Sequence, residues 1–284
     1  MNYRHAFHAG NFADVVKHLI LVRIVEYLKR KDAAFRVLDT HAGIGLYDLQ
    51  GNEAGRTGEW VDGIGRLIEH GLPDPAAELA APYLDAVRAQ NPEGGLRFYP
   101  GSPLIVRHLL RQQDRLFALE LHPDDAEKLR ENFAGDIQVR ATHLDGWAAL
   151  GTHLPPREKR GLVLIDPPFE QKGEFDRMVS GLVKAHQRWP GGIYALWYPI
   201  KDPHEIAEFV DALERSGIPK ILRIELNTRP FATPLRLHGT GMIVVNPPYT
   251  LEAEMKALLP ELARLLAEDG KGRVRMDWIA GENP

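Results

Sequence analysis

The sequence predicts an α/β fold, in which a mostly parallel sheet carries helices on both faces and a small helical segment is inserted after the first strand. Short apolar runs alternate with longer segments of helical period, which is the pattern of βαβ units. Four of these runs are followed by an acid, either at once or within a few residues. The second run begins only at Arg115, far beyond the first at 34–39, and this delay predicts the insertion.

Composition sets limits on the possible chemistry. The chain has 284 residues, of which 44% are hydrophobic and 26% charged, as in ordinary globular proteins. It has no apolar stretch long enough for a bilayer and no signal-peptide core at its start, so we expect a cytoplasmic protein. It contains no cysteine, which excludes disulfides, thiolate metal sites and cysteine nucleophiles. Radical methylation and covalent attack on pyrimidine C5 are therefore excluded, and we expect no metal.

The formal net charge of −4 argues against binding nucleic acid through bulk charge. Any such binding needs a local basic face, and each candidate set is equally explained as a solvated helix or loop. The candidates are Arg4, Lys17, Arg23, Lys29 and Arg30, then Arg107, Arg111 and Arg115, and finally Arg223, Arg229 and Arg236.

The most informative stretch is an apolar run at 161–165 that leads into Asp166-Pro167-Pro168-Phe169. A continuous apolar run is typical of a strand buried on both faces. Pro167 has no N–H and Pro168 restricts the residue before it, so the strand ends abruptly. A carboxylate, an unpaired backbone carbonyl and an aromatic ring then lie at the carboxyl end of a strand, where open α/β sheets bind ligands.

Two neighbouring acceptors suit an exocyclic aromatic amine such as N6 of adenine. By accepting its two hydrogens they favour a pyramidal nitrogen with an available lone pair, and the ring at Phe169 can stack on a base that has left its helix. The same residues are also explained by a strand followed by an ordinary turn. Other parts of the chain must decide between these interpretations.

Three further acids follow the other runs. Asp39 precedes Gly43 and Gly45, whose backbone can approach a ligand closely. A dinucleotide-binding G-x-G-x-x-G is absent because position 48 is Asp48, and an acid before a short G-x-G is the form used for S-adenosylmethionine.

Glu120 ends the run at 115–120, where an acid accepts from the hydroxyls of a ribose. Asp145, followed by Gly146, comes after a strand predicted at 137–141 and can accept from an adenine amine. Each acid alone is equally explained as a helix cap. Four successive strands that end in acids predict a single acidic edge of the sheet.

The remaining elements complete the fold. Asn11 is the expected N-cap of a helix at 12–29, and Ser102 that of a crossover helix with Pro103 at its first position. We therefore assign 1–45 and 100–284 to one domain and 46–99 to an inserted helical subdomain. Further expected elements are helices at 58–69, 76–90, 174–189 and 203–216, and strands at 192–198, 220–226 and 241–246.

Asn246-Pro247-Pro248-Tyr249 is a second candidate for the amine chemistry, because an asparagine can also accept from an amine. It follows the last hairpin, after the strand order has reversed. We therefore assign it to a turn.

The first residues form a segment without helix or strand period, in which Tyr3, Arg4, His5, Phe7 and His8 are crowded together. His5 and His8 could bind a metal, but no third ligand is evident nearby. We expect an arm that folds over the Asp166 segment, with Tyr3 against a base and Arg4 against a phosphate. The alternative is that these residues only cover the base of the sheet.

Taken together, the chain resembles the RlmJ family of bacterial 23S ribosomal RNA adenine-N6 methyltransferases over nearly its whole length. The first and last of the motifs that carry the resemblance are the most specific. The motifs are Tyr3-Arg4-His5-x-Phe7-His8-Ala9-Gly10-Asn11, Leu38-Asp39-Thr40-His41-Ala42-Gly43, Tyr99-Pro100-Gly101-Ser102-Pro103, Glu120-Leu121-His122-Pro123, Asp166-Pro167-Pro168 and Tyr194-Ala195-Leu196-Trp197-Tyr198-Pro199.

The resemblance implies a Rossmann-like class I methyltransferase, expected to be a monomer, that uses S-adenosylmethionine to methylate a flipped-out adenine of 23S ribosomal RNA. Asp166, Pro167 and Phe169 would act on the base, with Tyr3, Arg4 and His5 as further substrate contacts. Phe169 stands where we expect tyrosine, so we take stacking to be its role. The expected cofactor contacts are His18, His41, Gly43, Ser102, Glu120, Asp145, Gly146 and Asp166.

Two other functions fit the same residues. A DNA adenine-N6 methyltransferase would share the Asp166 segment, but no separate target-recognition domain is visible. An inactive RNA-binding protein could keep the fold, although retention of all four acids argues against it.

Overall fold

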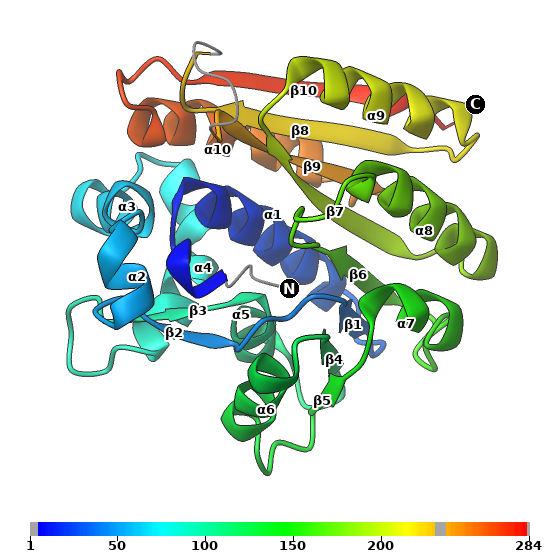
Figure 1. Cartoon of the computed structure of the whole chain (residues 1–284), viewed down its shortest axis with the longest axis horizontal. Coiled ribbons are helices and arrows are strands. Elements are labelled where there is room, and N and C mark those ends of the chain that lie inside the picture. The colour runs from blue at the N-terminus through cyan, green and yellow to red at the C-terminus, as the bar shows by residue number, and fades with distance from the viewer. Residues whose placement is uncertain (1–4, 231–236, 283–284) are drawn as a thin grey trace.

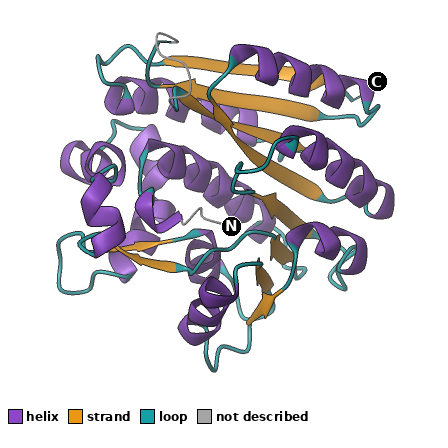
Figure 2. Cartoon of the chain, viewed as in Figure 1, coloured by secondary structure: helices purple, strands orange, loops and turns teal. Residues whose placement is uncertain are grey.

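The structure is a computed structural model that describes residues 5–230 and 237–282, except for the side chain of residue 52. Its centre is a sheet of eight strands in the order β10-β8-β9-β7-β6-β1-β4-β5, with helices on both faces (Figures 1 and 2). The strands β5, β4, β1, β6 and β7 are parallel, whereas β9 and β10 run antiparallel to their neighbours. The predicted α/β class is confirmed. The strands of this sheet are β1 (Arg36–Asp39), β4 (Arg115–Glu120), β5 (Val139–His143), β6 (Gly161–Ile165), β7 (Ile193–Ile200), β8 (Ile221–Asn227), β9 (Gly239–Val245) and β10 (Arg273–Ala280).

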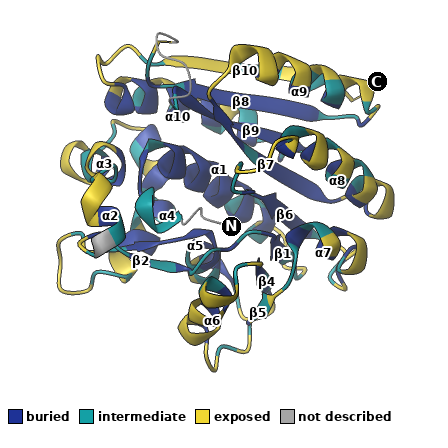
Figure 3. Ribbon diagram, in the orientation of Figure 1, coloured by how far each residue is buried: buried dark blue, intermediate teal, exposed yellow. Residues whose placement is uncertain are grey.

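Two groups of helices cover the sheet, and each forms its own apolar core with one face. One group consists of α1 (Phe12–Lys29), α4 (Ala76–Ala89), α5 (Ser102–Leu109), α6 (Pro123–Asn132) and α10 (Leu251–Leu266). The other consists of α7 (Gly146–Thr152), α8 (Glu174–Arg188) and α9 (Pro203–Arg215). Because both faces are covered, the central strands are buried throughout (Figure 3), which explains their continuous apolar sequences.

Helix α1 has the predicted bounds. The side chain of Asn11 accepts hydrogen bonds from the N–H groups of Ala13 and Asp14, as an N-cap does. The helix is apolar around almost its whole circumference and is therefore buried among α4, α5, α10 and the sheet. Its polar residues Asp14, Lys17 and His18 are buried with it.

Most of the other predicted elements are present with shifted ends. The strand expected at 137–141 is β5, two residues later, because Asp136 accepts a hydrogen bond from the N–H of Gln138 and forms a turn there. Ile137 is consequently 89% exposed. Helix α10 and the edge strand β10 were not predicted.

The segment 46–99 contains more than the two predicted helices. It opens with β2 (Leu46–Asp48), which pairs antiparallel with β3 (Phe98–Pro100) where the segment closes. Between them lie α2 (Asn52–Thr57), a π-helical turn η2 (Val61–Gly65), α3 (Arg66–His70) and α4.

The single helix predicted at 58–69 is broken at Gly63, whose backbone is not helical. The backbone of Gly63 passes very close to Gly10. A Cβ atom added at position 63 would lie 2.1 Å from the Gly10 carbonyl oxygen. Ile64 and Tyr83 join the same core as α1. The division into two domains stays our proposal, with the inserted segment sharing the main core. No helix among the described residues is long and apolar enough to span a membrane.

The Asn246 segment forms a turn at the edge of the sheet opposite Asp166. Strand β9 runs antiparallel to β7, so Val245 lies beside Tyr194 near the beginning of β7. Asn246 adopts a φ of 52°, and its side-chain amide donates to the carbonyl oxygens of Pro190 and Gly192. The turn assignment is correct.

We predict that Asn246→Ala lowers the free energy of unfolding by about 2–3 kcal/mol, because it loses two hydrogen bonds and because alanine tolerates a left-handed backbone conformation less well than asparagine does. Asn246→Gly loses only the hydrogen bonds and should be less damaging. Thermal denaturation of both variants measures the difference. Equal losses would show that the backbone conformation contributes nothing.

Candidate active site

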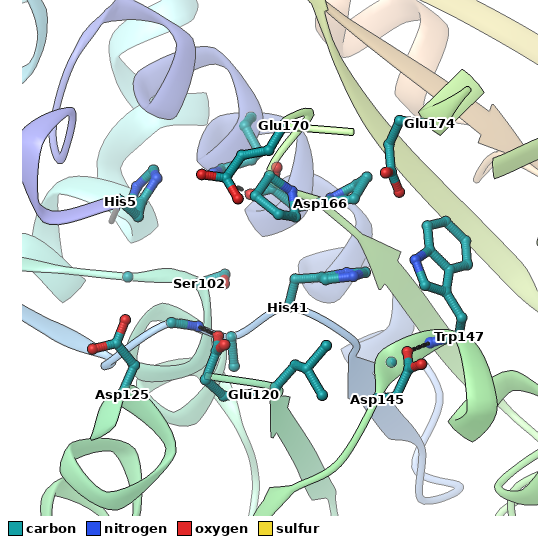
Figure 4. Close-up of a pocket in the computed structure, with 18 of the residues that line it drawn as sticks. His5, His41, Ser102, Glu120, Asp125, Asp145, Trp147, Asp166, Glu170 and Glu174 are labelled. Atoms are coloured by element: carbon teal, nitrogen blue, oxygen red, sulfur yellow. Dashed lines mark hydrogen bonds and ion pairs between the residues drawn. The ribbon is translucent and has the colours of Figure 1, made fainter. Parts of the chain in front are cut away.

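Four acids meet at one edge of the sheet. Asp39 and Glu120 end β1 and β4, while Asp145 and Asp166 follow β5 and β6. Since these four strands are parallel neighbours in the order β6-β1-β4-β5, their carboxyl ends lie side by side. Figure 4 shows Glu120, Asp145 and Asp166 around one cavity. The sequence pattern therefore predicted the common edge correctly.

A cavity of about 1080 Å³, including solvent at its mouth, occupies this edge. Every cofactor contact expected from the sequence lines it, together with Pro167 and His5. The expected contacts are His18, His41, Gly43, Ser102, Glu120, Asp145, Gly146 and Asp166.

Glu120 is held by backbone groups on both of its oxygens. Oε2 accepts from the N–H of Gly43 at 2.9 Å, and Oε1 accepts from the N–H of His122 at 2.8 Å. Burial raises the pKa of Glu120 above its usual value, although these N–H groups oppose the rise. Each carboxylate oxygen keeps a further lone pair, so the group can still accept from two hydroxyls of a ligand.

Two glycines shape the cavity wall. Gly43 has a φ of 61°, and a Cβ there would lie 2.2 Å from the hydroxyl of Tyr47. A Cβ at Gly146 would lie 2.2 Å from the carbonyl oxygen of Thr40. Both positions therefore require glycine.

Asp145 both caps a helix and lines the cavity. It is the N-cap of α7, since its Oδ1 accepts from the N–H of Trp147 at 2.8 Å. It also lines the cavity, where Oδ2 is available to a ligand.

Ser102 differs from its prediction in one respect. The N-cap of α5 is Gly101, and Ser102 is the first residue of the helix. Its hydroxyl instead donates to Oδ2 of Asp39 at 2.6 Å. Asp39 is completely buried behind the cavity wall, and burial raises its pKa to about 7. The pair fixes the start of α5 against the end of β1.

His41 is a neutral group in the cavity wall, because burial lowers its pKa to about 4. The hydroxyl of Thr40 donates to the carbonyl oxygen of Leu164 and lies 2.8 Å from Nδ1 of His41. A hydroxyl has one proton, so Nδ1 must donate to it. His41 therefore carries its proton on Nδ1 and offers Nε2 as an acceptor.

The main feature that sequence reasoning missed is an ion pair at Asp166. Nζ of Lys17 lies 2.5 Å from Oδ2 of Asp166 and 2.8 Å from Oδ1 of Asp14. Burial disfavours the ammonium group, but the charges of Asp14 and Asp166 outweigh it, so the pKa of Lys17 lies above its usual value. The side chain is only 4% exposed. The available signal was a charged residue inside an otherwise apolar helix, which must find a partner.

Part of the candidate basic face is buried and is therefore ruled out as a surface for nucleic acid. Lys17, Arg23 and Arg223 are all buried and paired, the latter two with Glu254 and Asp277. They cannot form a surface for nucleic acid. Arg4 and Arg236 lie outside the described residues.

A second cavity meets the first at Asp166, Pro167 and Pro168, which line both. Phe169 and Trp197 line only the second. The Phe169 ring packs against Phe175 and Trp197, with centroid distances of 5.0 and 5.9 Å. Lys201 and Arg229 also line the second cavity. The Asp166 segment thus lies between the two cavities, and Phe12, Phe169 and Trp197 give the second one an aromatic lining.

The N-terminal segment reaches this junction. His5, in the 3₁₀ turn η1 (His5–Phe7), lines both cavities, and its Nε2 lies 2.9 Å from Oδ2 of Asp14. His8 pairs with Glu59 of the inserted segment. Tyr3 and Arg4 lie outside the described residues, so the arm over the Asp166 segment stays a prediction.

Comparison with known proteins gives the family. A family model described as "Ribosomal RNA large subunit methyltransferase D, RlmJ" matches residues 32–280. Ribosomal RNA large subunit methyltransferase J of Escherichia coli is 46% identical over 282 residues, covering 99% of this chain and 100% of the relative. The protein of the same name from Haemophilus influenzae is 44% identical over 284 residues, with the same coverage.

A solved structure has the same fold. A protein from Legionella pneumophila is 34% identical and superposes with a TM-score of 0.87, covering 95% of this chain and 98% of that one. With a family model across most of the chain and full-length relatives at this identity, the chain belongs to the RlmJ family of ribosomal RNA large subunit methyltransferases.

Proposed function

We propose that this protein transfers the methyl group of S-adenosylmethionine to the exocyclic N6 amine of a flipped-out adenine in 23S ribosomal RNA. Family membership supports the reaction class and the RNA substrate. The observation that carries the site assignment is the position of Asp166 between two cavities. One has the groups for a nucleoside cofactor, and the other has aromatic walls for a base.

The first cavity fits S-adenosylmethionine. Glu120 would accept from the two ribose hydroxyls, and Asp145 from the adenine amine of the cofactor. A side chain at Gly43 or Gly146 would collide with Tyr47 or Thr40 and distort this wall. When bound, the cofactor supplies the electrophilic methyl group.

The Asp166 segment provides two acceptors for an amine with two hydrogens. The Asp166 carboxylate and the Pro167 carbonyl oxygen would each accept one hydrogen, which favours a pyramidal nitrogen whose lone pair is withdrawn from conjugation with the ring. Lys17 donates to Oδ2 of Asp166 and leaves both lone pairs of Oδ1, so we assign Oδ1 to the amine. Phe169 would stack on the extruded base, a contact worth about 1–3 kcal/mol.

The direct test is incorporation of labelled methyl groups into deproteinised 23S ribosomal RNA and into plasmid DNA. We expect the RNA to be labelled, with N6-methyladenosine as the product after digestion. Labelling of the DNA instead would favour a DNA methyltransferase. A folded protein that binds no S-adenosylmethionine would be an inactive scaffold.

The role of Asp166 is tested in the same assay. Asp166→Ala should abolish methyl transfer because it removes an acceptor of the amine, while cofactor affinity stays within about tenfold, or 1.4 kcal/mol. Asp166→Asn keeps a carbonyl acceptor and should retain more activity than Asp166→Ala. Substantial turnover by Asp166→Ala would place the catalytic acceptor elsewhere.

Glu120 gives a separate prediction about binding. Glu120→Ala should weaken S-adenosylmethionine binding by about 2–3 kcal/mol, as expected for the loss of charge-assisted hydrogen bonds. Calorimetry measures this effect, with Asp125→Ala as the control because it removes a carboxylate from the same wall. If a folded Glu120→Ala variant kept its affinity, the ribose would not lie against β4.

A further inference from the structure

Two buried tyrosines of the inserted segment reach the cofactor cavity through His18. Tyr83 lies on α4 and Tyr99 on β3, and both side chains are completely buried. Their hydroxyl oxygens are 2.9 Å apart, and the Tyr99 hydroxyl lies 2.7 Å from Nδ1 of His18. His18, on α1, lines the cavity. The proposed methyl transfer gives these tyrosines no role.

The direction of these hydrogen bonds follows from counting protons. Burial raises the pKa of both tyrosines, so each hydroxyl keeps its single proton. Within the described part of the chain, Tyr99 is the hydrogen-bond partner of the Tyr83 hydroxyl. If Tyr99 donated to Tyr83, the proton of Tyr83 would be buried without an acceptor, which folded proteins avoid. Tyr83 therefore donates to Tyr99, and Tyr99 donates to Nδ1 of His18.

This arrangement decides the tautomer of His18. Burial lowers its pKa to about 3, so the imidazole is neutral and has one ring proton. Nδ1 accepts from Tyr99, so the proton is on Nε2. The described residues form no hydrogen bond with Nε2, which is left for a ligand in the cavity.

We propose that Tyr83 and Tyr99 act as positioning residues that hold His18 as its Nε2–H tautomer, so that it offers a neutral donor to an anionic oxygen of the cofactor. The identity of the ligand rests on the proposed function, where the carboxylate of S-adenosylmethionine is the anionic group. The cavity would then contain a neutral donor at His18 and a neutral acceptor at His41. The inserted segment thereby acquires a part in cofactor binding.

The tautomer is measured without any ligand. Nitrogen-15 NMR of protein labelled at histidine distinguishes protonated from unprotonated ring nitrogens. The signals of His18 and His41 are identified by their loss in His18→Gln and His41→Gln. We expect His18 to carry its proton on Nε2 and His41 on Nδ1. A wild-type His18 that is protonated on Nδ1 would overturn the proposal.

Substitutions of Tyr99 and Tyr83 test whether these tyrosines determine the tautomer of His18. Tyr99→Phe should move His18 to a mixture of tautomers and weaken S-adenosylmethionine binding about threefold to tenfold, the usual effect of one hydrogen bond. Tyr194→Phe is the matched control, since Tyr194 is equally buried and hydrogen-bonds to the carbonyl oxygens of Ala185 and Trp189 in the other core. It should leave the His18 signals and the affinity unchanged.

Tyr83→Phe extends the series. Tyr99 can still donate to Nδ1 in this variant, so its effect on the tautomer should be smaller than that of Tyr99→Phe. A folded Tyr99→Phe variant with unaltered His18 signals would overturn the proposal that Tyr99 determines the tautomer. Failure of the wild-type protein to bind S-adenosylmethionine would contradict the proposed function instead, because the NMR experiment needs no cofactor.

Discussion

The ion pair between Lys17 and Asp166 is the contact on which the site depends. Isolated charges are costly to bury, and here a lysine and two carboxylates are removed from water together. Lys17 bridges Asp14 and Asp166, and His5 lies against Asp14. Removing Lys17 would leave both carboxylates without this counter-charge, so these residues form a single unit. The set also joins the N-terminal segment and α1 to the end of β6, and it orients the carboxylate that would meet the substrate.

The sheet supplies the frame for this contact. Parallel neighbours bring four acids to one edge, although they are far apart in the sequence. The prolines after Asp166 end β6 at the junction of the two cavities, so cofactor and base would approach the same carboxylate from different sides. The inserted segment contributes to the first cavity from behind, through Tyr83, Tyr99 and His18. Its apolar residues share a core with those of α1.

Local patterns predicted much of this from the sequence. The apolar runs that end in Asp39, Glu120 and Asp166 located the edge, because strand direction alone places such residues together. Contacts between distant residues were not accessible in this way. Lys17 and Asp166 are 149 positions apart, and a lysine in a helix is usually solvated. The break at Gly63 depends on the approach of Gly10, and the hydroxyl of Ser102 binds Asp39 instead of capping its own helix. In each case a tertiary contact overrode a local preference.

The most direct measurement is a crystal structure with S-adenosylhomocysteine and a short RNA that contains the target adenine. We predict that N6 lies within hydrogen-bond distance, about 2.7–3.2 Å, of both Oδ1 of Asp166 and the carbonyl oxygen of Pro167. The base should lie in the second cavity against Phe169, with the cofactor in the first. An adenine whose amine is bound away from Asp166, or a cofactor in the second cavity, would contradict it.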